Sequence, residues 1–150
     1  LTAVHTPGHA PDHLCFWHDA SGTVFCGDLA VEGSTVVIPA TSGGDLASYL
    51  ASLERVLALR PSRLLPGHGP IIEEPDRLLR RYLAHRRERE EQILAALRAG
   101  DGTVDAIVAR VYTSLSPELV GMAGESVMAH LIKLQREGRV TLSTDGWNII

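Results

Sequence analysis

The sequence has 150 residues, of which 45% are hydrophobic and 21% are charged, and its formal net charge is −4. This composition is typical of one ordinary globular domain or two small ones, and it excludes disorder and a collagen-like repeat. No apolar run approaches the roughly 20 residues of a spanning helix, and the first residues lack a basic region leading into an apolar one. We therefore expect a chain that neither spans a membrane nor is secreted.

Charge and cysteine content predict a cytoplasmic protein in two parts. Residues 1–75 carry 3 basic residues against 8 acidic ones, whereas residues 76–150 carry 11 against 10, and this shift favours two modules. The cysteines, Cys15 and Cys26, lie in apolar runs, so we expect buried, reduced thiols. Every basic residue except Lys133 is an arginine, which hints at a GC-rich bacterial genome.

The first part of the chain predicts a β-hairpin, a loop and a helix. Residues 13–18 and 23–28 are apolar runs separated by turn residues, as in a hairpin. Residues 29–44 are rich in Gly, Ser, Thr and Val, and they predict a loop or one irregular strand over VVIP. From Asp45 to Pro61, apolar residues recur at spacings of three and four, which predicts a helix lying on the sheet.

A short strand and a long charged helix come next. Residues 63–70, RLLPGHGP, predict a buried strand that ends in a turn carrying His68. A helix is expected from about residue 76 to residue 99, with Gly100 as its C-terminal stop. Its middle, HRREREEQ, is almost wholly charged and predicts a solvated helix between two modules.

The end of the chain predicts a winged helix. A short helix beginning near residue 103, a longer one over 117–137 and two strands around a turn at 143–146 give that element order. We place the domain boundary near residue 85, which divides the chain into residues 1–84 and 85–150.

Three residues at junctions between strand and loop are candidate metal ligands. His9 lies in TPGH, Asp28 closes FCGD, and His68 lies in PGHG. Imidazole nitrogen and carboxylate oxygen are common zinc ligands, and sheets present functional groups on their loops. Their spacing alone fits a metal site no better than three unrelated turns.

At these residues the chain resembles the metallo-β-lactamase superfamily, specifically its β-lactamase-like hydrolases with a C-terminal winged helix. The matching strings are HTPGHAPDH at 5–13, FCGD at 25–28, LLPGHGP at 64–70 and YLAHRRERE at 82–90. The resemblance implies an α/β (α+β) fold, the C-terminal half of an αββα sandwich followed by a winged helix. It also implies two zinc ions whose shared hydroxide attacks a carbonyl or phosphorus centre. His9 would ligate the first zinc, the catalytic Asp28 would join both, and His68 would ligate the second.

The sequence departs from this family at one point. The family's main metal motif, His-x-His-x-Asp-His, is absent, and residues 9–13 have one residue too many to replace it. We therefore expect the C-terminal portion of such a hydrolase, which alone binds zinc weakly and is inactive, because zinc needs three or four preorganised ligands. The uncovered half of a sandwich core also predicts self-association.

Further histidines and arginines are candidates for contacts with substrate. The resemblance places His85 and Arg86 at the edge of the site, and we assign substrate binding to these two residues and to His13. A solvent-facing loop histidine remains the alternative for His13 and His5, while His18 is expected at the surface and His130 in packing, with its ring satisfied by hydrogen bonds. The arginines form a stripe that could hold phosphates or could pair with neighbouring glutamates: Arg77, Arg80, Arg81, Arg86, Arg87 and Arg89.

Two functions follow from these residues. The first is a zinc-dependent hydrolase that cleaves an ester, thioester, lactone or phosphodiester bond in a small or anionic substrate, including single-stranded RNA. The second is a non-catalytic winged-helix module that binds nucleic acid or a protein partner. The helix over 117–137 carries only Lys133 and Arg136 against three glutamates, which disfavours DNA binding.

Overall fold

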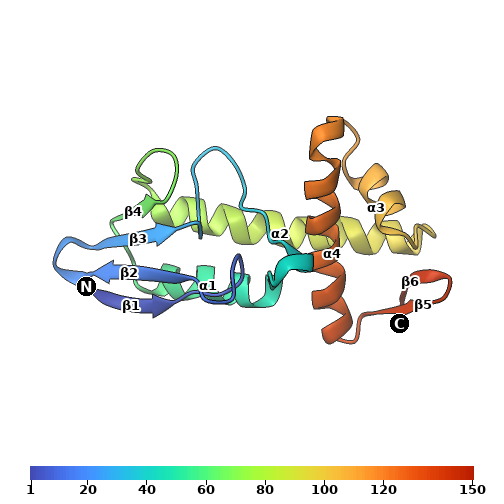
Figure 1. Ribbon diagram of the computed structural model, residues 1–150, viewed down its shortest axis with the longest axis horizontal. Coiled ribbons are helices and arrows are strands. Elements are labelled where there is room, and N and C mark those ends of the chain that lie inside the picture. The colour runs from blue at the N-terminus through green and yellow to red at the C-terminus, as the bar shows by residue number, and fades with distance from the viewer.

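The computed structural model describes residues 1–150 as a four-stranded sheet and a helical part, with one long helix running through both (Figure 1). The strands and helices are β1 (Thr2–His5), β2 (Leu14–His18), β3 (Thr23–Gly27), α1 (Leu46–Ala58), β4 (Arg63–Pro66), α2 (Pro75–Arg98), α3 (Val104–Val111), α4 (Val120–Arg136), β5 (Val140–Ser143) and β6 (Gly146–Ile149). No helix combines the length and apolar character that a membrane crossing requires.

The sheet has the strand order β1-β2-β3-β4, with antiparallel pairs except for the parallel pair of β3 and β4. The hairpin prediction is confirmed by β2 and β3, whereas β1 was not predicted. Alternate residues of the strands are buried against the helices, among them Cys15 and Cys26, which are free thiols. Phe16 and Phe25 are paired neighbours on the other face and are exposed. This exposed face motivates the prediction of self-association, which stays a prediction.

The predicted helix after Asp45 is confirmed as α1. The Asp45 carboxylate accepts a hydrogen bond of 2.8 Å from the backbone N–H of Ser48, as an N-cap does. The buried residues lie on one face of the helix and pack on the sheet: Leu46, Tyr49, Ser52, Leu53 and Val56. Of the two alternatives for residues 29–44, the loop is correct, because no strand forms over VVIP.

The long helix α2 begins with Pro75 at its first position and contributes to two separate apolar cores. One core of 18 buried residues joins the sheet, α1 and the first turns of α2, and another of 12 joins the last turns of α2 to α3, α4 and the hairpin β5–β6. The predicted boundary near residue 85 falls inside this continuous helix, and the division at that residue stays a prediction.

The charged middle of α2 is solvated on one face only, where Arg87, Glu88 and Glu91 are exposed. Arg86 is only 4% exposed, and Glu90 is half-buried. The reason is that α4 crosses α2 at this level (Figure 1). On the face of α2 that meets α4, opposite charges compensate the burial of Glu90.

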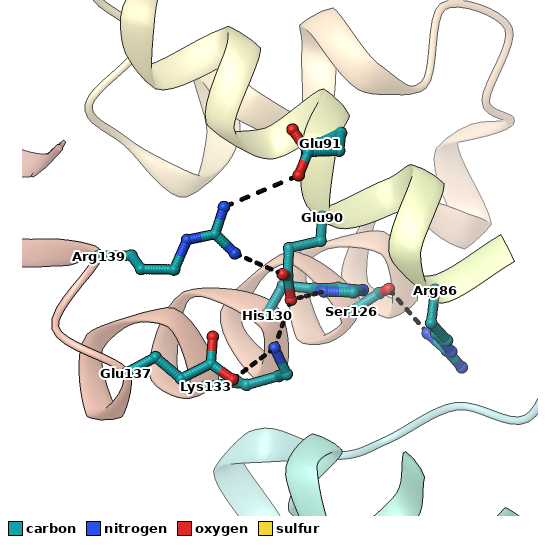
Figure 2. A network of polar contacts seen from close by, with 8 residues as sticks. All are labelled: Arg86, Glu90, Glu91, Ser126, His130, Lys133, Glu137 and Arg139. Carbon is teal, nitrogen blue, oxygen red and sulfur yellow. Dashed lines mark hydrogen bonds and ion pairs between the residues drawn. The ribbon is translucent and has the colours of Figure 1, made fainter. Parts of the chain in front are cut away.

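Those opposite charges come from α4 and the residues after it (Figure 2). The Glu90 carboxylate accepts hydrogen bonds of 2.7 Å from Lys133 and 2.9 Å from Arg139. The ring of His130, which is fully buried, places Nδ1 3.9 Å from the same carboxylate. The neighbouring His130 and the bond from Lys133 lower the pKa of Glu90 to about 2. The predicted packing position of His130 is confirmed by its burial, but the expectation that its ring is satisfied by hydrogen bonds is not, because both ring nitrogens are buried without a hydrogen-bond partner.

The winged-helix elements form as predicted. Thr103 caps α3 by accepting a hydrogen bond of 3.2 Å from Ala106, and Gly100 follows α2 with φ of 95°. The backbone N–H of Trp147 in β6 donates to the carbonyl of Gly102 at 2.8 Å. The hairpin is thus fixed to the loop between α2 and α3.

Candidate metal site

The three predicted metal ligands line one pocket at the edge of the sheet. We call it the His–Asp pocket; its volume is about 250 Å³, and it is lined by His9, Gly27, Asp28, Val31, Val36, Val37 and His68. His68 Nε2 lies 3.6 Å from Asp28 Oδ1. No three His, Cys, Asp or Glu side chains in the chain lie close enough together to hold a metal ion. The fold therefore gathers the three residues without forming a closed ligand set.

Asp28 and His68 reach the pocket because β3 and β4 are parallel. The carboxyl ends of two parallel strands meet at one edge of a sheet, and Asp28 and His68 follow those ends. The backbone N–H of Gly67 donates to the carbonyl of Gly27 at 2.9 Å, which holds the two strand ends together. The side chains of Asp28 and His68 are 48% and 83% exposed, so both are accessible to a ligand.

His9 reaches the pocket on a loop that packs closely against α1. Gly8 has φ of 137°, and a Cβ there would lie 2.3 Å from the Cα of Tyr49, so only glycine fits. The Gly8 carbonyl accepts a hydrogen bond of 2.9 Å from the backbone N–H of Asp45. His9 Nδ1 lies 2.8 Å from the carbonyl of Val37. Since a carbonyl only accepts, Nδ1 carries the proton and Nε2 keeps a free lone pair, which is the arrangement of a metal-ligating histidine.

His13 lies beside the strand end that carries Asp28, outside the residues that line the pocket. Its Nδ1 is 2.9 Å from the Thr6 hydroxyl, and a Cβ on Gly27 would lie 2.9 Å from its Nε2. Burial lowers the pKa of His13. Its assignment to substrate binding stays a prediction. His5 is the last residue of β1 rather than a loop residue, and its Nε2 lies 3.1 Å from the Pro11 carbonyl.

The string YLAHRR of α2 holds the loop that forms one wall of the pocket. The Tyr82 hydroxyl oxygen lies 2.7 Å from the carbonyl of Val31 and 2.8 Å from that of Ser34. One helical turn later, Arg86 donates to the carbonyl of Val36. Because Val37 in turn accepts from the His9 ring, Arg86 and His9 are joined through two consecutive residues of the loop.

The predicted substrate residues His85 and Arg86 line a second pocket that shares Val36 and Val37 with the first. We call it the arginine pocket, and its volume is about 270 Å³. It lies between the loop, α2 and the α3–α4 region, and its lining residues are Ser34, Thr35, Val36, Val37, His85, Arg86, Arg89, Tyr112, Leu115, Leu119, Met122, Ala123 and Ser126. The sequence did not identify Tyr112 or the apolar residues of this pocket as candidate functional residues.

Much of the predicted arginine stripe is neutralised within the chain. Arg77 and Arg80 pair with Glu74 and Asp76, each at 2.8 Å, and Arg81 pairs with Glu32 at 3.5 Å. The cations of α4 are also engaged, since Lys133 binds Glu90 and Glu137, and Arg136 binds Asp45. These pairs leave α4 without a free cation for a phosphate backbone.

Two family matches cover most of the chain. Residues 1–68 match the Metallo-beta-lactamase superfamily, and residues 103–147 match the Beta-lactamase associated winged helix domain. The chain therefore belongs to the metallo-β-lactamase superfamily. The second match shows that it carries the winged helix found with part of that superfamily.

Relatives and a solved structure agree with this assignment. The chain is 38% identical over 146 residues to "Beta-lactamase-like protein 2 homolog" of Drosophila melanogaster, covering 95% of this chain and 48% of the relative. It is 34% identical over 118 residues to "Atrochrysone carboxyl ACP thioesterase" of Claviceps purpurea, covering 75% of this chain and 36% of that protein. A metallo-beta-lactamase family protein from Thermus thermophilus superposes with a TM-score of 0.84 at 25% identity, covering 100% of this chain and 49% of that one.

The chain thus spans about half the length of the curated relatives it matches. Because its relatives come from insects, fungi and bacteria, the predicted bacterial origin stays a prediction.

Proposed function

We propose that this chain is the C-terminal half of a zinc-dependent hydrolase that cleaves an ester-like bond, with a thioester as the first substrate class to test. The observation that carries the proposal is the meeting of His9, Asp28 and His68 in one pocket, with His9 held through Nδ1. The thioesterase name of one relative supports the substrate class.

The donor chemistry of the pocket fits zinc. Two imidazoles and one carboxylate are ligand types that zinc takes, and a ligating histidine usually donates its other N–H to a carbonyl, as His9 does. His9, Asp28 and His68 would hold the metal together with ligands from outside this chain. Zinc bound there would supply Lewis-acid activation of water and of the scissile carbonyl.

The chain's own residues then have distinct tasks. Asp28 provides the negative charge that balances the metal, and the exposure of His68 lets it approach from the open side of the pocket. Tyr82 and Arg86 hold the loop carbonyls, and through them the His9 ring, in place before substrate arrives. The free, buried thiols of Cys15 and Cys26 support a cytoplasmic location, where thiols stay reduced.

The test compares the protein made from its complete reading frame with residues 1–150 alone. Elemental analysis is expected to find about two zinc ions in the complete protein, as in two-metal hydrolases, and less than one in this chain. Only the complete protein should hydrolyse an acyl thioester, and chelation should abolish that activity. Stoichiometric zinc or hydrolysis in residues 1–150 alone would show that the inactive-fragment part of the proposal is wrong. Chelator-insensitive hydrolysis by the complete protein would overturn the metal dependence.

A further inference from the structure

We propose that the arginine pocket binds the anionic end of an amphiphilic substrate, a phosphate or carboxylate joined to an apolar chain. This inference rests on the proposed hydrolase function. It concerns a part of the substrate that lies away from the bond to be cleaved. Its evidence is the charge, the unpaired polar atoms and the apolar wall of the pocket.

The first argument is positive charge without a balancing acid. Arg86 and Arg89 line the pocket, and none of its lining residues is acidic, although the chain has a net charge of −4. Arg86 and Arg89 form no ion pair with a carboxylate, in contrast to Arg77, Arg80 and Arg81 on the same helix. Buried charges in proteins are usually paired, so two neighbouring unpaired guanidinium groups favour an anionic ligand.

The nearest acid of α2 is turned away from these groups. Figure 2 shows the Arg86 side chain pointing away from the Glu90 carboxylate, which faces Lys133 and Arg139. Arg86 contacts neutral partners: the carbonyl of Val36, the Ser126 hydroxyl at 3.4 Å and the ring of Tyr49, 5.8 Å from the guanidinium carbon. Its charge therefore remains available to the pocket.

The second argument is a pair of buried polar atoms that lack partners. His85 Nδ1 and Arg89 Nε are buried and make no hydrogen bond. Such atoms are rare in folded proteins and call for an explanation, for example a bound ligand. Burial and the adjacent Arg86 and Arg89 lower the pKa of His85, so at neutral pH its ring is neutral and can donate one N–H.

The third argument is the apolar side of the pocket. Leu115, Leu119 and Met122 line it, and the last two are exposed despite their size. Arg89 stacks on Tyr112, with the guanidinium carbon 4.1 Å from the ring centre, which orients that cation beside the apolar residues. The combination fits a ligand with a charged head and an apolar chain better than a free inorganic anion.

The position of the pocket connects it to the proposed chemistry. Val36 and Val37 line both pockets, so a molecule anchored at the arginines lies next to the His–Asp pocket. Binding energy from such a remote group serves to position the reacting bond.

The test measures binding rather than turnover. The complete protein carrying Asp28→Asn, which removes a proposed metal ligand, is titrated calorimetrically with decyl phosphate, decanoate, decanol and inorganic phosphate. We expect decyl phosphate or decanoate to bind at least about 10-fold more tightly than decanol and than phosphate. Tighter binding of decyl phosphate assigns a phosphate head group, and tighter binding of decanoate assigns a carboxylate.

Matched variants locate the binding site. Arg89→Gln should weaken binding by about 10-fold or more, the effect of losing a charge-assisted bond, whereas Arg87→Gln, an exposed arginine on the same helix that lines no pocket, should not. Met122→Glu changes an exposed side chain and should weaken binding similarly through like-charge repulsion, even if Arg89→Gln disturbs folding.

Three results would overturn the proposal: decanol binding as tightly as the anions, equal losses from Arg87→Gln and Arg89→Gln, or binding of a single-stranded oligoribonucleotide without binding of either amphiphile. Absent binding together with metal-dependent hydrolysis by the unaltered complete protein would contradict this proposal alone. Retained binding without such hydrolysis would contradict the proposed function alone.

Discussion

The His–Asp pocket and the arginine pocket share Val36 and Val37 but differ in where their other residues come from. The first is built by loops at the ends of the sheet, within residues 9–68. The second needs the loop, the middle of α2 and residues 112–126 at once. The His–Asp pocket is thus lined without any residue of the winged helix, whereas the arginine pocket exists only where the winged helix packs on the rest of the chain.

The largest expected effect tests the chemical role of the His–Asp pocket. In the complete protein, Asp28→Asn should lower kcat for a hydrolysed thioester by about 100-fold or more. Replacing residues that only orient metal ligands already lowers metal affinity or activity by about 10-fold to 100-fold. Steady-state kinetics and zinc content provide the measurement. Asp19→Asn, in the turn after β2, is the matched control and should leave both unchanged; equal losses in the two variants would remove Asp28 from the site.

A smaller effect is expected from the residue that connects the two pockets. Arg86→Gln removes the donor that holds the Val36 carbonyl, and we expect about 10-fold weaker zinc retention together with lower kcat, because the His9 ring is held by the next residue of the loop. Chelator titration of the complete protein measures zinc retention, a property that a purely structural role would leave intact. Arg87→Gln serves as the control. Unchanged zinc retention in Arg86→Gln would show that Arg86 only supports the fold.

The smallest expected effect concerns stability of the contact between α2 and α4. Glu90→Gln should reduce the free energy of unfolding by about 2 kcal/mol at pH 7, the typical contribution of hydrogen bonds to a charged group. The pKa of Glu90 is lowered from 4.5 to about 2, so its stabilising contribution is complete above pH 4.5 and disappears as the pH falls toward 2.

The difference between wild type and Glu90→Gln should therefore shrink between pH 5 and pH 3, as measured by denaturant unfolding. Glu88→Gln is the control, because Glu88 is exposed and forms no ion pair. A difference that stays constant over this pH range would disprove the role of the Glu90 charge.

The comparison of the two pockets also explains what the sequence could predict. The spacing of Leu46, Tyr49 and Leu53 and the turn residues between strands predicted α1 and the hairpin, because local patterns determine local elements. The strand β1 was missed because it has four residues, of which only Val4 is even half-buried. His9, Asp28 and His68 were singled out because each lies in a short string that resembles a motif of the metallo-β-lactamase superfamily.

The rest of the site depends on contacts between distant residues. Arg86 binds a carbonyl 50 positions away, and Lys133 binds Glu90 across 43 positions. No local pattern encodes such partners, so Arg86 was assigned to substrate although it also holds the loop, and Glu90 was expected in solvent. The arginine pocket was missed for the same reason, since Arg89 and Tyr112 meet only after α3 and α4 have packed.

The continuity of α2 has a mechanical consequence. Residues 76–98 contain neither glycine nor proline, and the helix is unbroken from Pro75 to Arg98, so it has no hinge between the two cores it serves. A helix of this length is a stiff rod of about 36 Å. Moving the winged helix away from the sheet would break backbone hydrogen bonds within α2. The position of the winged helix relative to the sheet, and with it the wall of the arginine pocket that residues 112–126 supply, is therefore set by α2.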